Sequence, residues 1–296
     1  MLELKSLETF VWVARLGGFR AAADRLNTTQ PAISARIAQL EQELGVRLFS
    51  REHRRVALTP KGLDLLGRAE MMLSLRAEII ERAGEKTAMR GSIRLGVAES
   101  IVHTWLSRLI ERLHYLYPAV SLEIEVDISV NLRRGLLDHD LDIAFLVAPV
   151  NEPNLKSQPL CRYPLAWVAS PRLPLPAEPV SLNDLTRWPV ITFSRATMPY
   201  VLLQDLFNRP DLPPVRLFGN SSLATVVRMT LDGIGVSVIP AVVVAREIAE
   251  QRLRLFKTEA ELPSLAFSAA YPVKPDSHLA ATVATLAAEV AKEWRT

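Results

Sequence analysis

The sequence predicts an α+β protein of several domains, in which a small helical domain and one long helix precede a larger α/β domain. At roughly 150 residues per domain, the 296 residues allow about two domains. Before residue 90, apolar residues recur at helical spacing, whereas from Gly91 onwards short apolar runs typical of strands alternate with helical segments. Hydrophobic residues make up 49% and charged residues 23%, which is typical of a chain with a sizeable core.

Three short helices and a hairpin are expected in the first 60 residues. Apolar spacing predicts helices over 6–16, 19–26 and 30–44, and extended pieces over 46–51 and 55–59. Pro31 fits the first turn of the third helix, because the N–H that proline lacks would have no partner there. Residues 1–60 therefore have the parts of a winged helix-turn-helix, a motif whose second helix lies in the DNA major groove.

A long linker helix is predicted from Pro60 to about Glu85, within a linker segment of residues 61–90. Its apolar stripe consists of Leu66, Ala69, Leu73, Ala77 and Ile80. A stripe of this kind must be buried. We expect it to pair with the same helix of a second subunit, because no predicted domain surrounds it. Packing within its own domain is the alternative.

Residues 91–296 are expected to form an α/β domain of two subdomains with a mainly parallel sheet. The first α/β unit combines strands over 93–97, 121–127 and 141–147 with helices over 101–116 and 130–137. A second unit follows, and the last helix, about 277–294, is expected to return to the first. Subdomain I is thus predicted at about 91–162 and 268–296, and subdomain II at about 163–267.

Charge is concentrated near the N-terminus. The first 60 residues hold nine basic and six acidic side chains, so the whole net charge of +3 is located there. This asymmetry indicates an anionic partner for that end. The single cysteine, Cys161, excludes an intrachain disulfide, and the sequence predicts neither a signal peptide nor a transmembrane run. We therefore expect a cytoplasmic protein without a membrane partner.

Polar side chains at the start of the third helix have the chemistry to read DNA. Gln pairs bidentately with adenine, Arg with guanine, and Ser with either, which makes Gln30, Ser34 and Arg36 candidate base readers. Threonines before the helix suit phosphate contacts, and Arg54 at the wing tip suits the negative minor groove. The alternative is a solvated basic surface. The candidate DNA-binding residues are Thr28, Thr29, Gln30, Pro31, Ser34, Arg36, Arg51 and Arg54.

A long ordered pattern spans residues 4–66. It reads Phe10-x2-Val13-Ala14-x3-Gly18-Phe19-x-Ala21-Ala22, Leu26-x2-Thr29-Gln30-Pro31-Ala32-Ile33-Ser34, Ile37-x2-Leu40-Glu41-x2-Leu44-Gly45-x2-Leu48-Phe49-x-Arg51 and Leu58-Thr59-Pro60-x-Gly62. This pattern resembles the LysR-type transcriptional regulators. One departure is Ala35, at a position that is often basic in the family. Base or phosphate contact by residue 35 is therefore not expected, and Arg36 beside it would supply the charge.

The rest of the chain resembles the effector domain of the same family more loosely. The similar stretches are Gly91-x-Ile93-Arg94-Leu95-Gly96, Tyr117-Pro118-x-Val120, Leu141-Asp142-Ile143-Ala144 and Asp232-Gly233-Ile234-Gly235-Val236-x3-Pro240. The resemblance implies a domain similar to periplasmic binding proteins, with two subdomains flanking a cleft. It also implies a homo-oligomer, a dimer or usually a tetramer. A regulator of this kind binds promoter DNA, and a small-molecule effector bound between the subdomains switches its arrangement.

An effector is expected beyond the carboxyl ends of the strands, where ligands bind in open α/β sheets. The candidate effector-binding residues are Ser100, Ile101, Ser129, Phe193, Ser194 and Asn220. Hydroxyls and helix N-termini favour an anion, and similar positions in the family hold small carboxylates, so a small organic acid is expected. N-capping without ligand contact is the alternative for each residue. Glu99 would repel an anion unless it points away or pairs with Arg, which leaves a neutral or cationic effector open.

No metal, cofactor or catalytic activity is expected. His139 lies among three aspartates, but Asp142 belongs to a predicted strand, and the histidines lack metal spacing. The Gly233-x-Gly235 pair lacks the third glycine of a dinucleotide fingerprint, and no nucleophile or acid–base set converges. Cys161 is expected to be a buried small residue. An enzyme and a transport-binding protein are the rival functions, and the N-terminal DNA module opposes the second.

Overall fold

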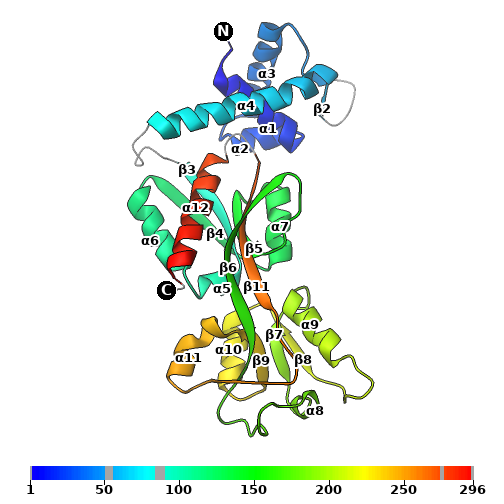
Figure 1. The fold of residues 1–296 in the computed structure, drawn as a ribbon. Helices are drawn as coiled ribbons and strands as arrows, with labels where there is room; N and C mark the ends of the chain where they lie inside the picture. Colours follow the sequence, from blue (N-terminus) through cyan, green and yellow to red (C-terminus); the bar gives the residue numbers. More distant parts are fainter. Residues whose placement is uncertain (1, 51–55, 84–90, 274–276, 295–296) are drawn as a thin grey trace. The chain divides into compact units, whose positions relative to one another are not determined.

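The computed structural model describes residues 2–50, 56–83, 91–273 and 277–294 (Figure 1). The chain divides into two units, one of residues 1–88 with 273–279 and one of residues 89–272 with 280–296. Among the described residues, no helix is long and apolar enough to cross a membrane.

The first unit contains the predicted three helices, hairpin and long helix. Its elements are α1 (Leu4–Leu16), α2 (Phe19–Arg25), α3 (Gln30–Leu44), β1 (Phe49–Ser50), β2 (Ala57–Leu58) and α4 (Pro60–Ala83). Gly17 and Gly45 end α1 and α3 with φ of 63° and 65°, the left-handed conformation that glycine adopts without strain. The two strands pair antiparallel but are shorter than predicted.

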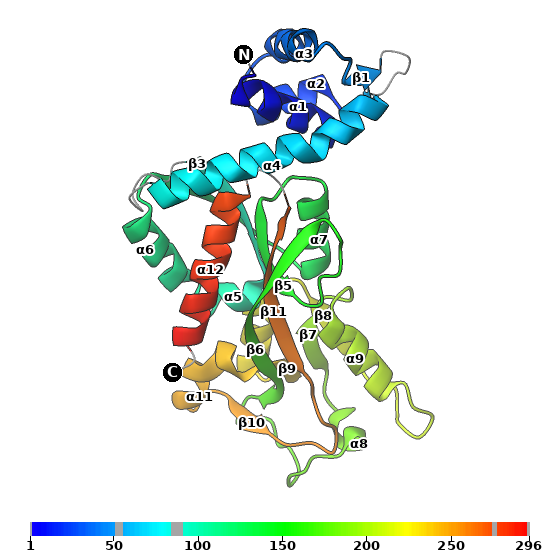
Figure 2. The same cartoon turned by 45° about the horizontal axis from the view of Figure 1, so that its top comes forward.

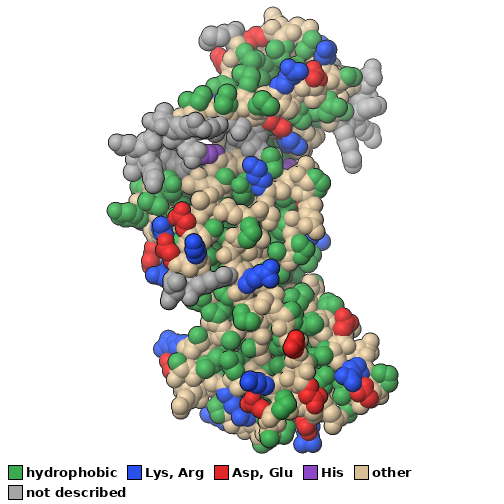
Figure 3. All heavy atoms as spheres, viewed as in Figure 1, with side chains coloured by type: hydrophobic (Ala, Val, Ile, Leu, Met, Phe, Trp, Pro, Cys, Tyr) green, Lys and Arg blue, Asp and Glu red, His purple; other side chains and the backbone are tan. Residues whose placement is uncertain are grey.

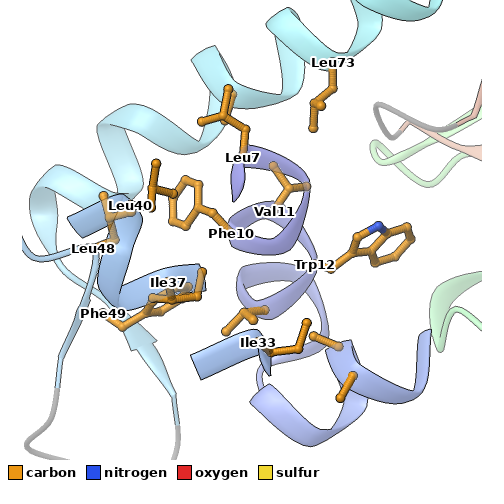
Figure 4. Packing of buried hydrophobic residues seen from close by; sticks show 14 residues of the cluster. Leu7, Phe10, Val11, Trp12, Ile33, Ile37, Leu40, Leu48, Phe49 and Leu73 are labelled. Atoms are coloured by element: carbon orange, nitrogen blue, oxygen red, sulfur yellow. The ribbon is translucent and has the colours of Figure 1, made fainter. Parts of the chain in front are cut away.

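An apolar core joins α1 and α3 to the hairpin and to α4 (Figure 4). Phe10 of α1 packs edge-on against Phe49 of β1, with 5.6 Å between the ring centroids. Ala69 and Leu73 of α4 are buried against the same core, and Arg15 of α1 forms an ion pair with Glu70. Part of the α4 stripe therefore packs within its own unit, as in the alternative above. The side chains of residues 77 and 80 lie outside the described part.

A different face of α4 carries exposed apolar side chains. Leu63, Met71, Leu75 and Ile79 are each more than half exposed, between 56% and 73%. They are not part of the predicted stripe. The described side chains of the predicted stripe thus face the core of the unit. The exposed apolar residues form a second set on another face of α4.

The second unit contains strands and helices in alternation. Its elements are β3 (Gly91–Val97), α5 (Glu99–Val102), α6 (Leu106–Leu116), β4 (Val120–Val126), α7 (Ser129–Leu137), β5 (Ile143–Val147), β6 (Leu155–Ala169), α8 (Leu182–Leu185), β7 (Val190–Phe193), α9 (Met198–Phe207), β8 (Leu217–Asn220), α10 (Leu223–Leu231), β9 (Val236–Pro240), a 3-10 turn (Ala241–Val244), α11 (Ala245–Ala249), β10 (Arg254–Phe256), β11 (Ser264–Pro272) and α12 (His278–Glu293).

The strands form a mixed sheet, which corrects the expectation of a mainly parallel one. The order is β4-β3-β5-β11-β6-β9-β7-β8, with β10 on β6. Pairing is parallel among β3, β4 and β5 and again among β7, β8 and β9. In contrast, β6 and β11 pair antiparallel with each other and with their other neighbours. Two groups of parallel strands are thus joined, within one sheet, by the antiparallel pair β6 and β11.

The pair β6 and β11 connects two halves of this unit, as Figures 1 and 2 show. Residues up to Pro164 of β6 pair with β11, and from Leu165 onwards β6 pairs with β9. We therefore use subdomain I for residues 91–164, 264–272 and 280–294, and subdomain II for residues 165–263.

The single helix predicted over 101–116 is wrong in two respects. The observed helical segment begins earlier, at Glu99, and it is divided into α5 and α6. The hydroxyl of Thr104 donates to the carbonyls of Ser100 and Ile101 at 3.0 and 3.1 Å, which closes the end of α5. Trp105 is fully buried and packs against Phe145 of β5. Burial of this large ring requires a bend that helical periodicity does not reveal.

Two glycines of α4 allow a matched test of the first unit. A Cβ on Gly62 would collide with the backbone carbonyl of Leu48, whereas one on Gly67 would meet nothing within 4 Å. We expect Gly62→Ala to destabilise the unit by about 1–3 kcal/mol through overpacking, and Gly67→Ala to stabilise it by about 0.5–1 kcal/mol through helix propensity. Hydrogen exchange of peptides from α1 and α3 in the full chain measures both. Effects of the same sign would contradict the packing described.

Candidate functional site

The start of α3 presents a polar surface. Thr29 is the N-cap of the helix, and its hydroxyl accepts the N–H of Ala32 at 3.4 Å. Gln30, Pro31 and Ser34 are exposed. Gln30 and Ser34 are four residues apart and therefore lie on one face, within about 40° of each other around the axis. An exposed face of this kind at a helix N-terminus can enter a groove.

The other predicted DNA-binding residues are placed differently. Arg36 is half-buried and lies about 120° around the helix from Gln30, so the structure does not bring it onto the same face. Thr28 is half-buried in the turn before the helix. Arg51 and Arg54 lie outside the described residues.

A cavity of about 480 Å³ lies between the two subdomains of the second unit. Subdomain I contributes the ends of β3, β4 and β5, the starts of α5 and α7, and two side chains of β11. Subdomain II contributes the end of β7, the start of α9 and Ser221. The cavity therefore lies where the carboxyl ends of parallel strands from both subdomains meet, as expected for a ligand site in this architecture.

Three of the six predicted effector residues line the cavity, namely Ser100, Ser129 and Phe193. Ser129 Oγ accepts the N–H of Val147 at 2.9 Å and keeps its own proton for a further bond. Ser100 is 4% exposed.

The other three predicted residues do not line the cavity. Ile101 is fully buried in the core behind it. Asn220 uses its side-chain oxygen to accept the N–H of Ser222, which shapes the turn before α10. Ser194 Oγ is buried without a hydrogen-bond partner among the described residues. Ile101 thus belongs to the core, and the side chain of Asn220 serves its own turn.

Sequence reasoning missed the start of α9, and it also missed Asp127 before α7. Thr197, Met198 and Pro199 line the cavity from subdomain II. The hydroxyl of Thr197 donates to the carbonyl of Ser194 at 2.7 Å and does not cap the helix. The Thr-Met-Pro sequence could have signalled a helix start, since proline is common in a first turn.

Glu99 links the two subdomains. Its carboxylate accepts the N–H of Leu223 at 2.5 Å and that of Ala224 at 3.4 Å, at the N-terminus of α10. The Nε2 atom of His103 lies 3.7 Å from the same carboxylate. A carboxylate is stabilised at a helix N-terminus by the helix dipole and the free N–H groups. Glu99 thus pairs with a helix end rather than with Arg.

The charge of the cavity wall is negative. Glu99 and Asp127 are its ionisable residues, and among its described lining residues there is no Lys or Arg. Behind Phe267, burial of Tyr163 raises the pKa of its hydroxyl, which therefore adds no charge at neutral pH. Basic and acidic side chains are interspersed over the face of subdomain II drawn in Figure 3. The lining residues therefore determine the local charge.

Asp142, one of the aspartates near His139, serves the fold. Asp142 accepts from the backbone N–H and the guanidinium of Arg94 at 3.0–3.3 Å, and Arg94 also donates to the carbonyl of His139 at 2.6 Å. Among the described residues, no group of three or more His, Cys, Asp or Glu could hold a metal ion. Cys161 is buried, 4% exposed.

Comparison with known proteins gives matches to both units. Residues 4–63 match the bacterial regulatory helix-turn-helix protein family, lysR, and residues 86–295 match the LysR substrate binding domain. The transcriptional regulator PtxR of Pseudomonas aeruginosa is 30% identical over 92% of this chain and 87% of its own length. The regulator BbuR of Bordetella bronchiseptica is 30% identical over 85% of this chain and 78% of its own length.

Solved structures show the same fold. A full-length variant of OxyR from Pseudomonas aeruginosa superposes with a TM-score of 0.64 at 23% identity, covering 99% of this chain and 95% of that one. The matched relatives are named as transcriptional regulators and not as enzymes. The chain belongs to the family of LysR-type transcriptional regulators.

Proposed function

We propose that this chain is a cytoplasmic, sequence-specific regulator that binds promoter DNA through α3 and is switched by a small-molecule effector held between its two subdomains. The cavity carries the proposal, because both subdomains contribute to its wall. A ligand bound there contacts both, so its binding free energy depends on how they are arranged.

The exposed start of α3 supports the DNA contact. Gln30 and Ser34 share one face and would reach base edges, whereas the position of Arg36 on the flank suits a phosphate. The exposed apolar residues of α4 (Leu63, Met71, Leu75 and Ile79) support pairing with a second copy, in a dimer or a tetramer. Two α3 helices of a dimer would then read half-sites about one helical turn apart.

Selection of genomic fragments by the purified full-length protein tests this function. At about 0.15 M salt, a physiological ionic strength, we expect enrichment of a few interrupted inverted repeats near promoters. Uniform, salt-sensitive binding without enrichment would contradict the assignment of α3 as a sequence reader, because contacts with phosphates alone carry no sequence information.

Two substitutions on α3 distinguish a residue that contacts bases from a residue that contacts phosphates. Gln30→Ala should lower the ratio of specific to non-specific affinity, at a cost of about 1–3 kcal/mol at the cognate site. Arg36→Ala should weaken specific and non-specific binding equally. It should also reduce the slope of log affinity against log salt concentration by the amount expected for about one phosphate contact.

The matched control is Gln39→Ala, an exposed glutamine on the side of α3 opposite Gln30. Titration of fluorescent cognate and scrambled duplexes at several salt concentrations measures all three variants. Equal loss on both duplexes in Gln30→Ala, or any loss in Gln39→Ala, would contradict the proposed orientation of the helix.

The bond from Glu99 to α10 gives a test of coupling between the subdomains. Both Glu99 and Ser222 accept N–H groups at the start of α10, but Glu99 belongs to the other subdomain. Glu99→Ala should speed hydrogen exchange at the start of α10 and also in residues 98–103, by about fivefold to thirtyfold for a loss of 1–2 kcal/mol. Ser222→Ala should affect α10 alone. Identical exchange patterns for the two variants would show that Glu99 does not couple the halves.

A further inference from the structure

We propose that the cavity takes a ligand that presents an ammonium group to Glu99 and Asp127 and an apolar body to the hydrophobic side chains of the wall. This inference rests on the proposed function, in which the effector occupies this cavity. The sequence favoured a small organic acid and left a cationic effector open, and this inference selects the cation. The charge and the hydrogen bonding of the cavity wall support it.

Both ionisable groups of the wall are carboxylates. Glu99 and Asp127 line the same cavity of about 480 Å³, and among the described lining residues no Lys or Arg offsets their negative charge. Inside a partly desolvated cavity, charges interact more strongly than in water. A free carboxylate would meet two like charges, whereas an ammonium would meet two opposite ones.

Both carboxylates already accept hydrogen bonds from the chain. Asp127, directly before α7, accepts the N–H of Ile128 at 2.6 Å and the side-chain amide of Asn131 at 3.0 and 3.1 Å. Glu99 occupies the start of α10. At α9, Pro199 removes one backbone donor from the first turn. Of the helix starts near the cavity, that of α10 is thus taken up by Glu99 and that of α9 lacks one donor, whereas that of α7 has no side-chain cap.

A buried hydroxyl adds a further acceptor. Ser100 lines the cavity and is 4% exposed, and its hydroxyl makes no hydrogen bond with any residue that the structure describes. An ammonium has three donors and no acceptor, so it can donate to Ser100 and to both carboxylates.

Most of the remaining wall is apolar, although the hydroxyl-bearing Ser129, Thr197 and Ser221 also line it. Subdomain I contributes Val126, Val147 and Phe267, and subdomain II contributes Phe193 and Met198. A volume of this size is typical of sites that enclose a small organic molecule, with few polar groups that orient it. The wall therefore favours an amine with an alkyl or aryl body over a compact, strongly hydrated one.

Matched probes test the charge preference on the full-length protein. The pairs are 2-phenylethylamine with 3-phenylpropionate, and hexylamine with heptanoate, and phenylalanine distinguishes a zwitterion from a simple cation. Ligand-observed NMR gives each affinity. We expect each amine to bind about tenfold or more tightly than its matched acid.

Neutral isosteres assign the preference to the two carboxylates. In the double variant Glu99→Gln, Asp127→Asn, the preference should disappear, because each amide keeps one oxygen as an acceptor for a backbone N–H but carries no charge. Asp211→Asn is the control, because Asp211 pairs with Arg209 on the surface and does not line the cavity. It should leave the preference unchanged.

Acids that bind as well as or better than amines would overturn the proposal. So would a preference that survives in the double variant, or no binding of either series up to roughly 10 mM, an affinity too weak for a specific site. Selection of genomic DNA by the same protein separates the two proposals. Enriched promoters without an amine preference would overturn this inference alone, and an amine preference without DNA enrichment would overturn only the regulator.

Discussion

The antiparallel pairing of β6 with β11 is the interaction on which the rest of the second unit depends. The chain passes from subdomain I to subdomain II along β6 and returns along β11, and the two strands are paired from Leu155 with Pro272 to Pro164 with Ser264. A register shift lies between Phe267 and Ser268, at the level of the cavity. Because Leu265 and Phe267 of β11 line the cavity, the connection between the subdomains is also part of the candidate ligand site.

The elements that the sequence predicted well are those set by local chemistry. Helices α1 to α3 follow apolar spacing, and their ends follow glycine and capping residues that act within one turn. The direction of β6 and β11 was not predictable in this way, because strand pairing depends on residues about a hundred positions apart. The division between α5 and α6 was missed for a similar reason, since Trp105 is buried against Phe145 of a distant strand.

The candidate site shows the same division between local and distant causes. The sequence correctly placed three residues at the cavity, namely Ser100, Ser129 and Phe193. Sequence periodicity locates the carboxyl ends of strands, and ligand sites in this architecture lie there. The same argument also selected Asn220, whose side chain instead closes its own turn. The role of Glu99 could not be seen in the sequence, because its partners, Leu223 and Ala224, lie more than a hundred residues away.

In the proposed function, ligand chemistry and subdomain arrangement involve the same atoms at Glu99, whose carboxylate joins subdomain I to α10. A carboxylate at a helix N-terminus contributes about 0.3–1 kcal/mol, and up to about 2 kcal/mol when partly buried. To move a two-state equilibrium from 1:99 to 99:1, a ligand needs about 5.5 kcal/mol of differential affinity. The carboxylate alone therefore cannot supply the switch. Most of the difference must come from contacts that exist only when both walls are in place, such as those of Phe193 and Met198 with an apolar body. In this arrangement the charged end of a ligand would determine which molecules bind, and its apolar end would determine how far the subdomains move.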